Sequence, residues 1–248
     1  MSGVEIAGVS AITVSYAIAV VGFLAGCGIA LALFNSKADS AEGGFAWLFA
    51  IPAVAGVSYV LMLFDVGVVS VGDNEVYLFR YVDWLLTTPI LVGYVGYVAG
   101  APRKWILGAA AADAGMIAVG LWATLSTGIA TWIGFAVSGA FHISLLGVLY
   151  GVFPRYVDDH PRRRRLFKVL QNHVGLLWLA YPLIWVLSPA GFGTVSVVGT
   201  AMIIAYVDVV AKTPYVYFVW RDRTAFEEDD GEFGTVDDVA EQPVAAAD

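Results

Sequence analysis

The sequence contains few cysteines, few histidines and little charge. Its 248 residues include one cysteine and three histidines. Cys27 has no partner for an internal disulfide, and no cysteines and histidines lie at metal-ligand spacing, so we expect neither a disulfide framework nor a metal site. We interpret Cys27 as a small packing residue. Charged residues make up 14% of the chain, against about 25% in soluble domains, which argues against a soluble protein.

The N-terminus lacks the positively charged segment of a signal peptide and runs into an apolar stretch that is too long for one. Apolar residues, in contrast, make up 59% of the chain. The length fits about seven membrane spans of roughly 20 residues, with short loops and no room for a soluble catalytic domain. We therefore expect a multi-pass protein of the cell membrane that contacts lipids, binds no nucleic acid and is not an enzyme.

Seven apolar stretches are separated by turn residues and charges. They lie at roughly 10–34, 45–64, 80–99, 103–122, 131–153, 166–187 and 194–220. The predicted fold class is therefore all-α, a bundle of seven transmembrane helices.

Basic residues in alternate loops predict the orientation of this bundle. Of thirteen Lys and Arg residues, eleven lie in the first, third and fifth loops or next to them, or after the last span. These are Lys37; Arg103 and Lys104; Arg155, the arginine run 162–165 and Lys168; and Arg221 and Arg223. The other loops contain none. By the positive-inside rule the N-terminus lies outside and the C-terminus in the cytoplasm.

The chain divides into a membrane domain, residues 1–223, and an acidic tail, residues 224–248. The tail is rich in Asp and Glu and poor in large apolar residues, so we expect it to be disordered in the cytoplasm. The arginine run 162–165 is interpreted as a positive-inside anchor, with a docking or lipid-contact patch as the alternative.

Five ionisable residues interrupt the predicted spans. A charge at the centre of a bilayer costs about 2.5–3.5 kcal/mol on insertion scales, so such residues need partners and by default indicate function. They are Arg80, Asp83, Asp113, Asp208 and Lys212.

The spacing of these charges predicts one buried cluster. Arg80, Asp83 and Thr87 share a face of the span at 80–99, and Asp208 and Lys212 are one turn apart in the last span. Two cations and two anions sum to zero charge. The cluster could be a salt-bridge network that only holds two helices together, but apolar residues would usually stabilise a bundle as well. A buried lysine is also a suitable amine for a Schiff base, with the aspartates as counter-ions.

Aromatic residues predict an apolar ligand beside this cluster. Trp178, Tyr181 and Trp185 share one face at i, i+3 and i+7. Tyr59, Tyr81 and Trp84 could complete a cage around a conjugated ligand, although ordinary aromatic packing is the alternative. Pro182 should loosen the backbone hydrogen bonding of the span at 166–187, which suits a helix that tilts.

Three motifs resemble the microbial (archaeal) rhodopsins. They are the segment 80–89 with Arg80, Asp83, Trp84, Thr87 and Thr88; the segment 178–182 with Trp178, Tyr181 and Pro182; and Asp208 with Lys212. The resemblance covers residues 10–220 and implies an all-trans retinal bound to Lys212 as a protonated Schiff base.

The resemblance also implies a role for each site residue. Asp83 would be the primary counter-ion and proton acceptor, and Asp208 the second counter-ion, held by Tyr59 and Tyr181. Arg80 would lie on the outer side, and Asp113 would be a structural acid bonded to Thr88. Trp84 and Trp178 would sandwich the polyene, and further residues would line the pocket: Tyr81, Thr87, Thr88, Leu91, Met116, Pro182 and Trp185.

The proton-relay positions favour a sensor over a pump. Where pumps of this family have a carboxylic proton donor, this chain has Tyr94, and a phenol with an ordinary pKa of about 10 is a poor donor. At the positions resembling the paired proton-release acids it has Ala190 and Thr200. A light-driven proton pump and a seven-helix protein without chromophore are the alternatives.

Tyr94, His142 and His173 resemble the type I sensory rhodopsins, in which a histidine at the place of His173 couples the photocycle to signalling. Each histidine could instead make an ordinary interhelical hydrogen bond. Tyr206 resembles a tyrosine of the type II receptors, but the threonine that accompanies it there is Ala211 here. A middle rhodopsin remains an alternative. The receptor reading implies phototaxis through a two-span, methyl-accepting membrane transducer packed against the spans at 166–187 and 194–220. Association with further copies of the chain is left open.

Overall fold

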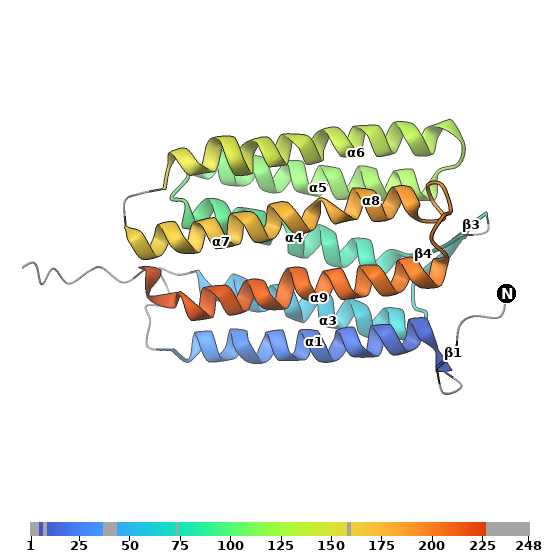
Figure 1. Ribbon diagram of the computed structural model, residues 1–248, viewed down its shortest axis with the longest axis horizontal. Coiled ribbons are helices and arrows are strands. Elements are labelled where there is room, and N and C mark those ends of the chain that lie inside the picture. The colour runs from blue at the N-terminus through green and yellow to red at the C-terminus, as the bar shows by residue number, and fades with distance from the viewer. Residues whose placement is uncertain (1–4, 7–8, 37–43, 73, 158–159, 227–248) are drawn as a thin grey trace, which may run out of the picture.

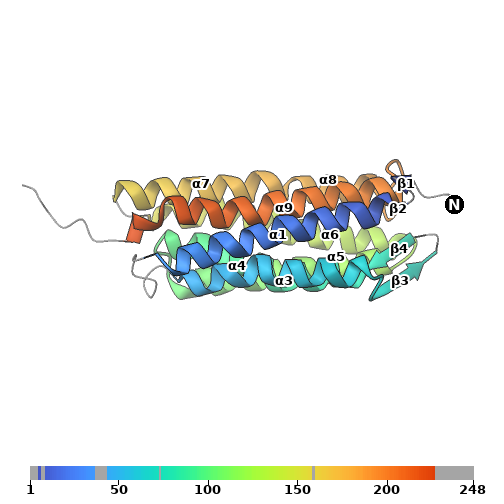
Figure 2. The same ribbon diagram turned by 90° about the horizontal axis from the view of Figure 1, so that it is seen from below.

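The computed structural model describes residues 5–6, 9–36, 44–72, 74–157 and 160–226. It consists of long helices that run side by side (Figures 1 and 2). In chain order they are α1 (Ala11–Phe34), α3 (Phe45–Leu63), α4 (Leu78–Val98), α5 (Arg103–Leu125), α6 (Ile129–Gly147), α7 (Pro161–Trp178), α8 (Ala180–Leu187) and α9 (Val197–Arg221).

Seven rods result, because α7 and α8 form one span and α6 continues through the π-helix η1 (Val148–Val152) and the 3-10 helix η2 (Phe153–Arg155). Six of the rods are long and apolar enough to cross a membrane. The seventh, α4, is not one of these six, and it contains Arg80, Asp83 and two threonines. The prediction of a seven-helix bundle is confirmed, and α4 contains more of the predicted site residues than any other rod.

Large apolar side chains cover the outside of the bundle. Ile18 on α1, Leu107 on α5, Ile143 on α6 and Leu176 on α7 are each more than three-fifths exposed. A soluble protein rarely shows such a surface, whereas lipid matches it. The protein is therefore a multi-pass membrane protein. The helix α1 begins and α9 finishes at opposite ends of the bundle, as an odd number of spans requires (Figure 1).

The loops differ from the sequence prediction in three places. Residues Val68–Val71 (β3) and Asn74–Tyr77 (β4) form an antiparallel hairpin between α3 and α4, and a second pair, β1 (Glu5–Ile6) and β2 (Val9–Ser10), precedes α1. The helix α7 begins at Pro161, five residues before the predicted start at 166, since the side chain of His160 caps its first turn. The arginine run 162–165 is therefore helical.

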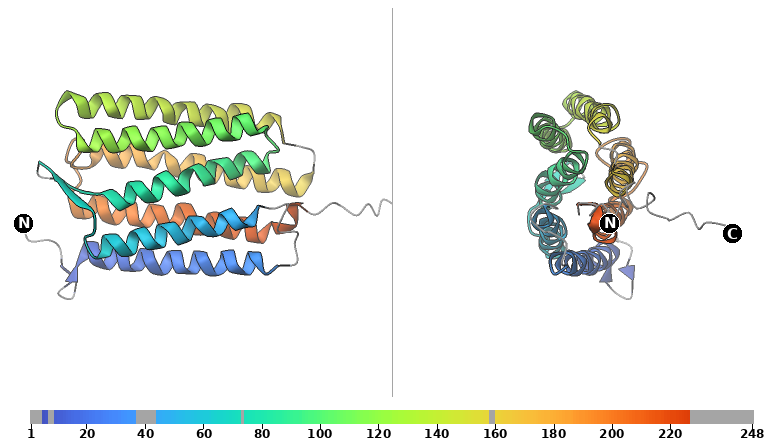
Figure 3. Two further views of the ribbon diagram at one scale, coloured as in Figure 1. Left: turned by 180° about the vertical axis from the view of Figure 1, so that it is seen from behind. Right: turned by 90° about the vertical axis from the view of Figure 1, so that its left-hand side faces the viewer.

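The rod of α7 and α8 breaks at Leu179. Pro182 has no backbone N–H to donate four residues back, which explains a break at this place. The π-helix η1 was not predicted; Gln171 Nε2 of α7 donates to its Leu149 carbonyl at 2.7 Å. The end-on view in Figure 3 shows α6 and α9 separated by the rod of α7 and α8.

The described structure extends past residue 223, the boundary predicted between the membrane domain and the tail. The 3-10 helix η3 (Arg223–Phe226) follows α9. The ring of Phe226 lies 6.0 Å from that of Phe45 and 5.9 Å from that of Tyr97, centroid to centroid. Residues 227–248 of the acidic tail, and Lys37 of the first basic loop, lie outside the described residues.

Candidate functional site

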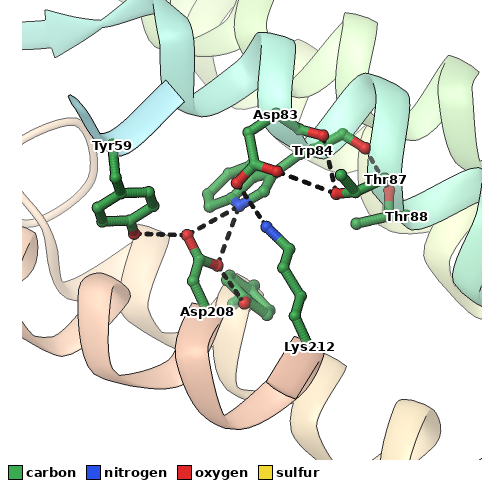
Figure 4. A network of polar contacts seen from close by, with 8 residues as sticks. Tyr59, Asp83, Trp84, Thr87, Thr88, Asp208 and Lys212 are labelled. Carbon is green, nitrogen blue, oxygen red and sulfur yellow. Dashed lines mark hydrogen bonds and ion pairs between the residues drawn. The ribbon is translucent and has the colours of Figure 1, made fainter. Parts of the chain in front are cut away.

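A buried ion pair joins α9 to α4. Lys212 Nζ donates a hydrogen bond to Asp83 Oδ2, and the two side chains are 1% and 0% exposed (Figure 4). Thr87, one turn after Asp83, donates to Asp83 Oδ1 at 3.1 Å and to its backbone carbonyl at 2.8 Å. The spacing of four residues places both side chains on one face of α4. Asp83 thus holds the amine with one oxygen and Thr87 with the other.

Asp208, one turn before Lys212, is surrounded by neutral donors. Tyr59 of α3 donates to its Oδ2 at 2.6 Å, and Tyr181 of α8 donates to its Oδ1 at 2.5 Å. Trp84 Nε1 of α4 donates to both oxygens, at 3.0 and 3.2 Å (Figure 4). The two tyrosines were expected at Asp208 from the family resemblance, but the hydrogen bond from Trp84 was not. A buried indole N–H can only donate, so an acceptor for it was to be expected.

Arg80 does not join the charge cluster that the sequence analysis predicted. Its Nη2 donates to the hydroxyl of Tyr16 on α1 at 2.8 Å, and its guanidinium carbon lies 5.7 Å from the ring centroid of Tyr77. Within the described part of the chain it forms no ion pair with Asp83 or Asp208, and its buried Nε has no hydrogen-bond partner. Arg80 lies about one turn nearer the hairpin end of α4 than Asp83 does, and there it contacts Tyr16 and Tyr77 instead of the aspartates.

Tyr77 ends the hairpin strand β4, outside the membrane-spanning segments. Burial raises the pKa of its phenol, and the positive charge of Arg80 only partly offsets this. Tyr77 therefore stays neutral beside Arg80. Neither Tyr16 nor Tyr77 was singled out in the sequence, because nothing in the spacing of either residue relates it to Arg80.

A cavity of about 180 Å³ lies next to Asp208. Two of its lining residues, Trp84 and Tyr181, donate hydrogen bonds to this carboxylate. The cavity extends between α4, α5, α6, α8 and α9. The predicted pocket residues that line it are Tyr81, Trp84, Thr88, Met116, Trp178, Tyr181, Pro182 and Trp185. Leu91 and Thr87 are buried but are not among the lining residues.

Hydrogen bonds fix the polar atoms of the cavity wall. The hydroxyls of Tyr81 and Thr124 are 2.7 Å apart, and Trp185 Nε1 donates to Thr124 Oγ1 at 2.9 Å. Thr88 Oγ1 donates to Asp113 Oδ2 at 2.6 Å, the pairing that the sequence analysis expected between α4 and α5. Thr124 also belongs to this wall, and no motif or spacing singled it out.

The remaining predicted residues lie away from the amine. His173 Nε2 of α7 is 3.1 Å from the carbonyl oxygen of Ala211, one residue before Lys212. Tyr94 is buried nearer the η3 end, with its ring centroid 6.3 Å from that of Tyr215. Ala190 and Thr200 line the cavity, and the buried hydroxyl of Thr200 has no hydrogen-bond partner in the described structure.

This arrangement can hold a conjugated aldehyde. The amine of Lys212 could form an imine whose positive charge Asp83 and Asp208 would balance. The aromatic cavity next to Asp208 fits an extended apolar chain, and the cost of burying ionised groups is compensated by the donors around them. The residues present therefore fit a retinal bound at Lys212.

Comparisons with known proteins agree with this reading. The model of a family described as bacteriorhodopsin-like protein matches residues 10–226. The chain is 49% identical over 217 residues to Sensory rhodopsin-1 of Halobacterium sp. (strain SG1), covering 87% of this chain and 88% of the relative. It is 48% identical over 217 residues to Sensory rhodopsin I of Haloarcula marismortui, with 87% and 92% covered. The crystal structure of thermophilic rhodopsin from Rubrobacter xylanophilus superposes with a TM-score of 0.82 at 28% identity, covering 87% of this chain and 97% of that one.

Proposed function

This chain belongs to the bacteriorhodopsin-like family, and on that premise we propose that it is a retinal photoreceptor that resembles the type I sensory rhodopsins. All-trans retinal would be held on Lys212 as a protonated Schiff base. One observation carries the proposal: a fully buried lysine amine contacts Asp83, and one turn away Asp208 is hydrogen-bonded by two residues that line an aromatic cavity, Trp84 and Tyr181. The relatives named sensory rhodopsin I, from halophilic archaea, support the same function.

When bound, retinal supplies the absorption of visible light and a light-driven change of shape. The protein's part is to hold the charge and the proton around Lys212 Nζ. Asp83 Oδ2 contacts this nitrogen and is placed to accept its proton. Thr87 fixes the other oxygen of Asp83, so the accepting atom keeps its direction.

Asp208 would act as the stationary counter-ion. Its oxygens already accept hydrogen bonds from Tyr59, Trp84 and Tyr181, which come from three different helices. Because these hydrogen bonds occupy both oxygens of Asp208, they hold the carboxylate in place and make it a poor proton acceptor. Among the described residues, Thr87 is the one neutral side chain that donates to Asp83, so Asp83 is the better placed of the two aspartates to accept the proton.

The residues along the proton path favour a receptor. Tyr94 lies eleven residues after Asp83, about 16 Å along the same helix. Its phenol is a poor proton donor to the Schiff-base nitrogen. At the hairpin end, Ala190 and Thr200 line the cavity and neither can release a proton as a carboxylic acid does. The deprotonated state should therefore be long-lived, which gives a partner time to respond.

Signalling would pass to a two-span, methyl-accepting membrane transducer beside α7, α8 and α9. Tyr206 is 70% exposed on the outer face of α9, where such a partner would pack. His173 hydrogen-bonds α7 to the backbone next to Lys212, so a change at the lysine reaches α7 directly. The break at Leu179 would let the two parts of this rod tilt relative to each other.

Reconstitution in lipid vesicles tests the proposal against its alternatives. The protein is expressed without chromophore, supplied with all-trans retinal and illuminated while the pH of the suspension is recorded. A photoreceptor should gain visible absorbance and give a slow photocycle without sustained pH change. Sustained, strong pH change under light would instead support a proton pump. Absence of visible absorbance would support a membrane protein without chromophore.

A further inference from the structure

Three exposed basic residues form a stripe along the first turns of α7. They are Arg162, Arg165 and Lys168, which follow one another at intervals of three residues and therefore lie on one side of the helix. The side chain of Arg165 is 66% exposed, and its Nε lies 3.9 Å from Oδ1 of Asp222, a carboxylate that Arg221 already binds at 2.6 Å. Within the described part of the chain, Arg162 and Lys168 have no ion-pair partner. The described residues therefore leave the positive charge of this basic stripe largely unbalanced.

The last described residue lies close to the basic stripe. The beginning of α7 and the end of α9 are at the same end of the bundle (Figure 1). The 3-10 helix η3 follows α9 and ends at Phe226, whose ring centroid lies 5.9 Å from the guanidinium carbon of Arg163, the neighbour of Arg162. Arg163 Nε in turn donates to the backbone carbonyl of Val98 at 2.8 Å, which anchors this contact to α4. The residues after Phe226 therefore begin next to the stripe.

The residues that follow carry the opposite charge. Residues 227–248 contain nine of the chain's 21 acidic residues and no Lys or Arg, and residues 227–230 are an unbroken acidic run, Glu-Glu-Asp-Asp. Four residues of extended chain cover roughly 13 Å, and the helical rise from Arg162 to Lys168 is roughly 9 Å. The acidic run is thus long enough to lie along the stripe. Its attachment at Phe226 keeps it at a high local concentration there.

We propose that the basic stripe is a docking surface for the chain's own acidic segment, residues 227–232. An exposed ion pair contributes little by itself, but several pairs made by a tethered segment reinforce one another, because docking costs such a segment little translational freedom. The stripe belongs to α7 and the segment continues from α9 and η3, so docking connects the ends of these two helices. The contact needs no chromophore and goes beyond the proposed function.

Anionic lipid headgroups are the competing occupant of the stripe. Leu176 and Leu179, eleven residues after Arg165 and Lys168 and on the same side of α7, are 66% and 51% exposed, so lipid lies near. The acidic segment has the advantage that Phe226 holds its beginning beside Arg163 in every molecule. A lipid headgroup has no such tether. The experiment therefore includes membranes with and without anionic lipid.

Spin labelling of the full chain tests the inference. Cys27→Ala removes the native thiol, and a nitroxide is attached at Gly231→Cys in the acidic segment or, as a control, at Ala245→Cys further along the tail. In vesicles of phosphatidylcholine, which carries no net charge, the label at 231 should be mostly restrained and the label at 245 mobile. Raising the salt from about 0.1 M to about 1 M shortens the Debye length from about 10 Å to about 3 Å. The ratio of restrained to mobile label at 231 should then fall about threefold or more.

Two variants with the same loss of charge locate the contact. One neutralises the basic stripe, with Arg162→Gln, Arg165→Gln and Lys168→Gln. The other neutralises three exposed basic residues of α5 and η2, with Arg103→Gln, Lys104→Gln and Arg155→Gln. The stripe variant should lower the ratio of restrained to mobile label at 231 by about threefold or more, and the control variant should leave it unchanged. Circular dichroism should show the same helix content in both, since all six side chains are exposed.

Several results would overturn the inference. A label at 231 that is as mobile as the label at 245 would show that the segment does not dock. Equal restraint of the label at 231 in the stripe variant and the control variant would assign the restraint to the packing of η3 instead of to the stripe. Release of the label when phosphatidylglycerol is included in the vesicles would assign the stripe to anionic lipid headgroups. None of these measurements requires retinal, so the photoreceptor proposal stands or fails separately.

Discussion

Trp84 Nε1 donates to both carboxylate oxygens of Asp208, at 3.0 and 3.2 Å, while the preceding residue, Asp83, accepts from Lys212. Two consecutive residues of α4 therefore contact two residues of α9 that are one turn apart. Consecutive side chains on a helix point in different directions. Asp83 and Trp84 can therefore both contact α9 only if α9 packs against the part of α4 that lies between these two side chains. The contact fixes the register of the two helices at the site.

Trp84→Phe tests the contribution of this contact. The variant keeps an aromatic ring in the cavity wall but removes the indole N–H, which leaves Asp208 with its two tyrosine donors. A hydrogen bond to a charged group contributes about 1.5–3 kcal/mol, so the free energy of unfolding should fall by that order. Thermal loss of the visible pigment measures it. A variant as stable as the unaltered protein would show that the indole nitrogen does not hold Asp208.

Asp83→Asn should move the absorption maximum to longer wavelength and suppress light-driven deprotonation of Lys212 Nζ. Without the nearby negative charge, the positive charge is held less tightly at the nitrogen and spreads further along the polyene. Absorption spectra and flash photolysis check both effects. Asp83→Glu is the control, because it retains a carboxylate and should retain proton transfer. An unchanged spectrum in the asparagine variant would contradict the role of Asp83.

Tyr94→Asp should speed the recovery of the photocycle by about tenfold or more, since a positioned carboxylic acid is a far better proton donor than a phenol. Flash photolysis of the reconstituted pigment measures the rate. Tyr94→Phe removes the hydroxyl without adding an acid and should leave recovery slow. If the aspartate variant recovers no faster than the unaltered pigment, the identity of this residue does not limit reprotonation.

Thr88→Val should destabilise the contact between α4 and α5. Thr88 Oγ1 is a donor to Asp113 Oδ2 at 2.6 Å, and Asp113 Oδ1 has no hydrogen-bond partner within the described residues. The variant would leave a buried carboxyl group unsatisfied at a cost of about 1–3 kcal/mol. Thermal denaturation followed at the pigment band measures this, and Thr88→Ser, which keeps the hydroxyl, should lose much less. Equal stability of the valine and serine variants would contradict a structural role for the pair.

Sequence patterns predict some of these features and not others, for physical reasons. Hydropathy reveals the spans, and spacings of three and four residues place Asp83 with Thr87 and Asp208 with Lys212, because both follow from the geometry of a single helix. Contacts between helices do not follow in this way. Tyr59 and Tyr181 were assigned to Asp208 only through the family resemblance. The two tyrosines beside Arg80, Tyr16 and Tyr77, were not predicted. The chain has twelve tyrosines, and packing decides which of them reaches a given charge.

Deviations from regular structure were only partly predictable from the sequence. The break at Leu179 was foreseeable from Pro182, whereas no sequence pattern indicated the π-helix η1, to which Gln171 of α7 donates a hydrogen bond. The start of α7 at Pro161 was missed because hydropathy reveals only apolar stretches, and the arginine run that follows Pro161 is polar. The side chain of His160 accepts a hydrogen bond from the backbone N–H of Arg163, and this cap allows the polar turn to be helical.

The most direct test of the account is to find where the chromophore is attached. The pigment formed with all-trans retinal is reduced with borohydride, digested and analysed by mass spectrometry. We expect one retinyl group, on the nitrogen of Lys212, and none in Lys212→Ala, which should also remain colourless. A coloured protein in which Lys212 carries no modification would contradict the photoreceptor proposal and leave only the membrane fold.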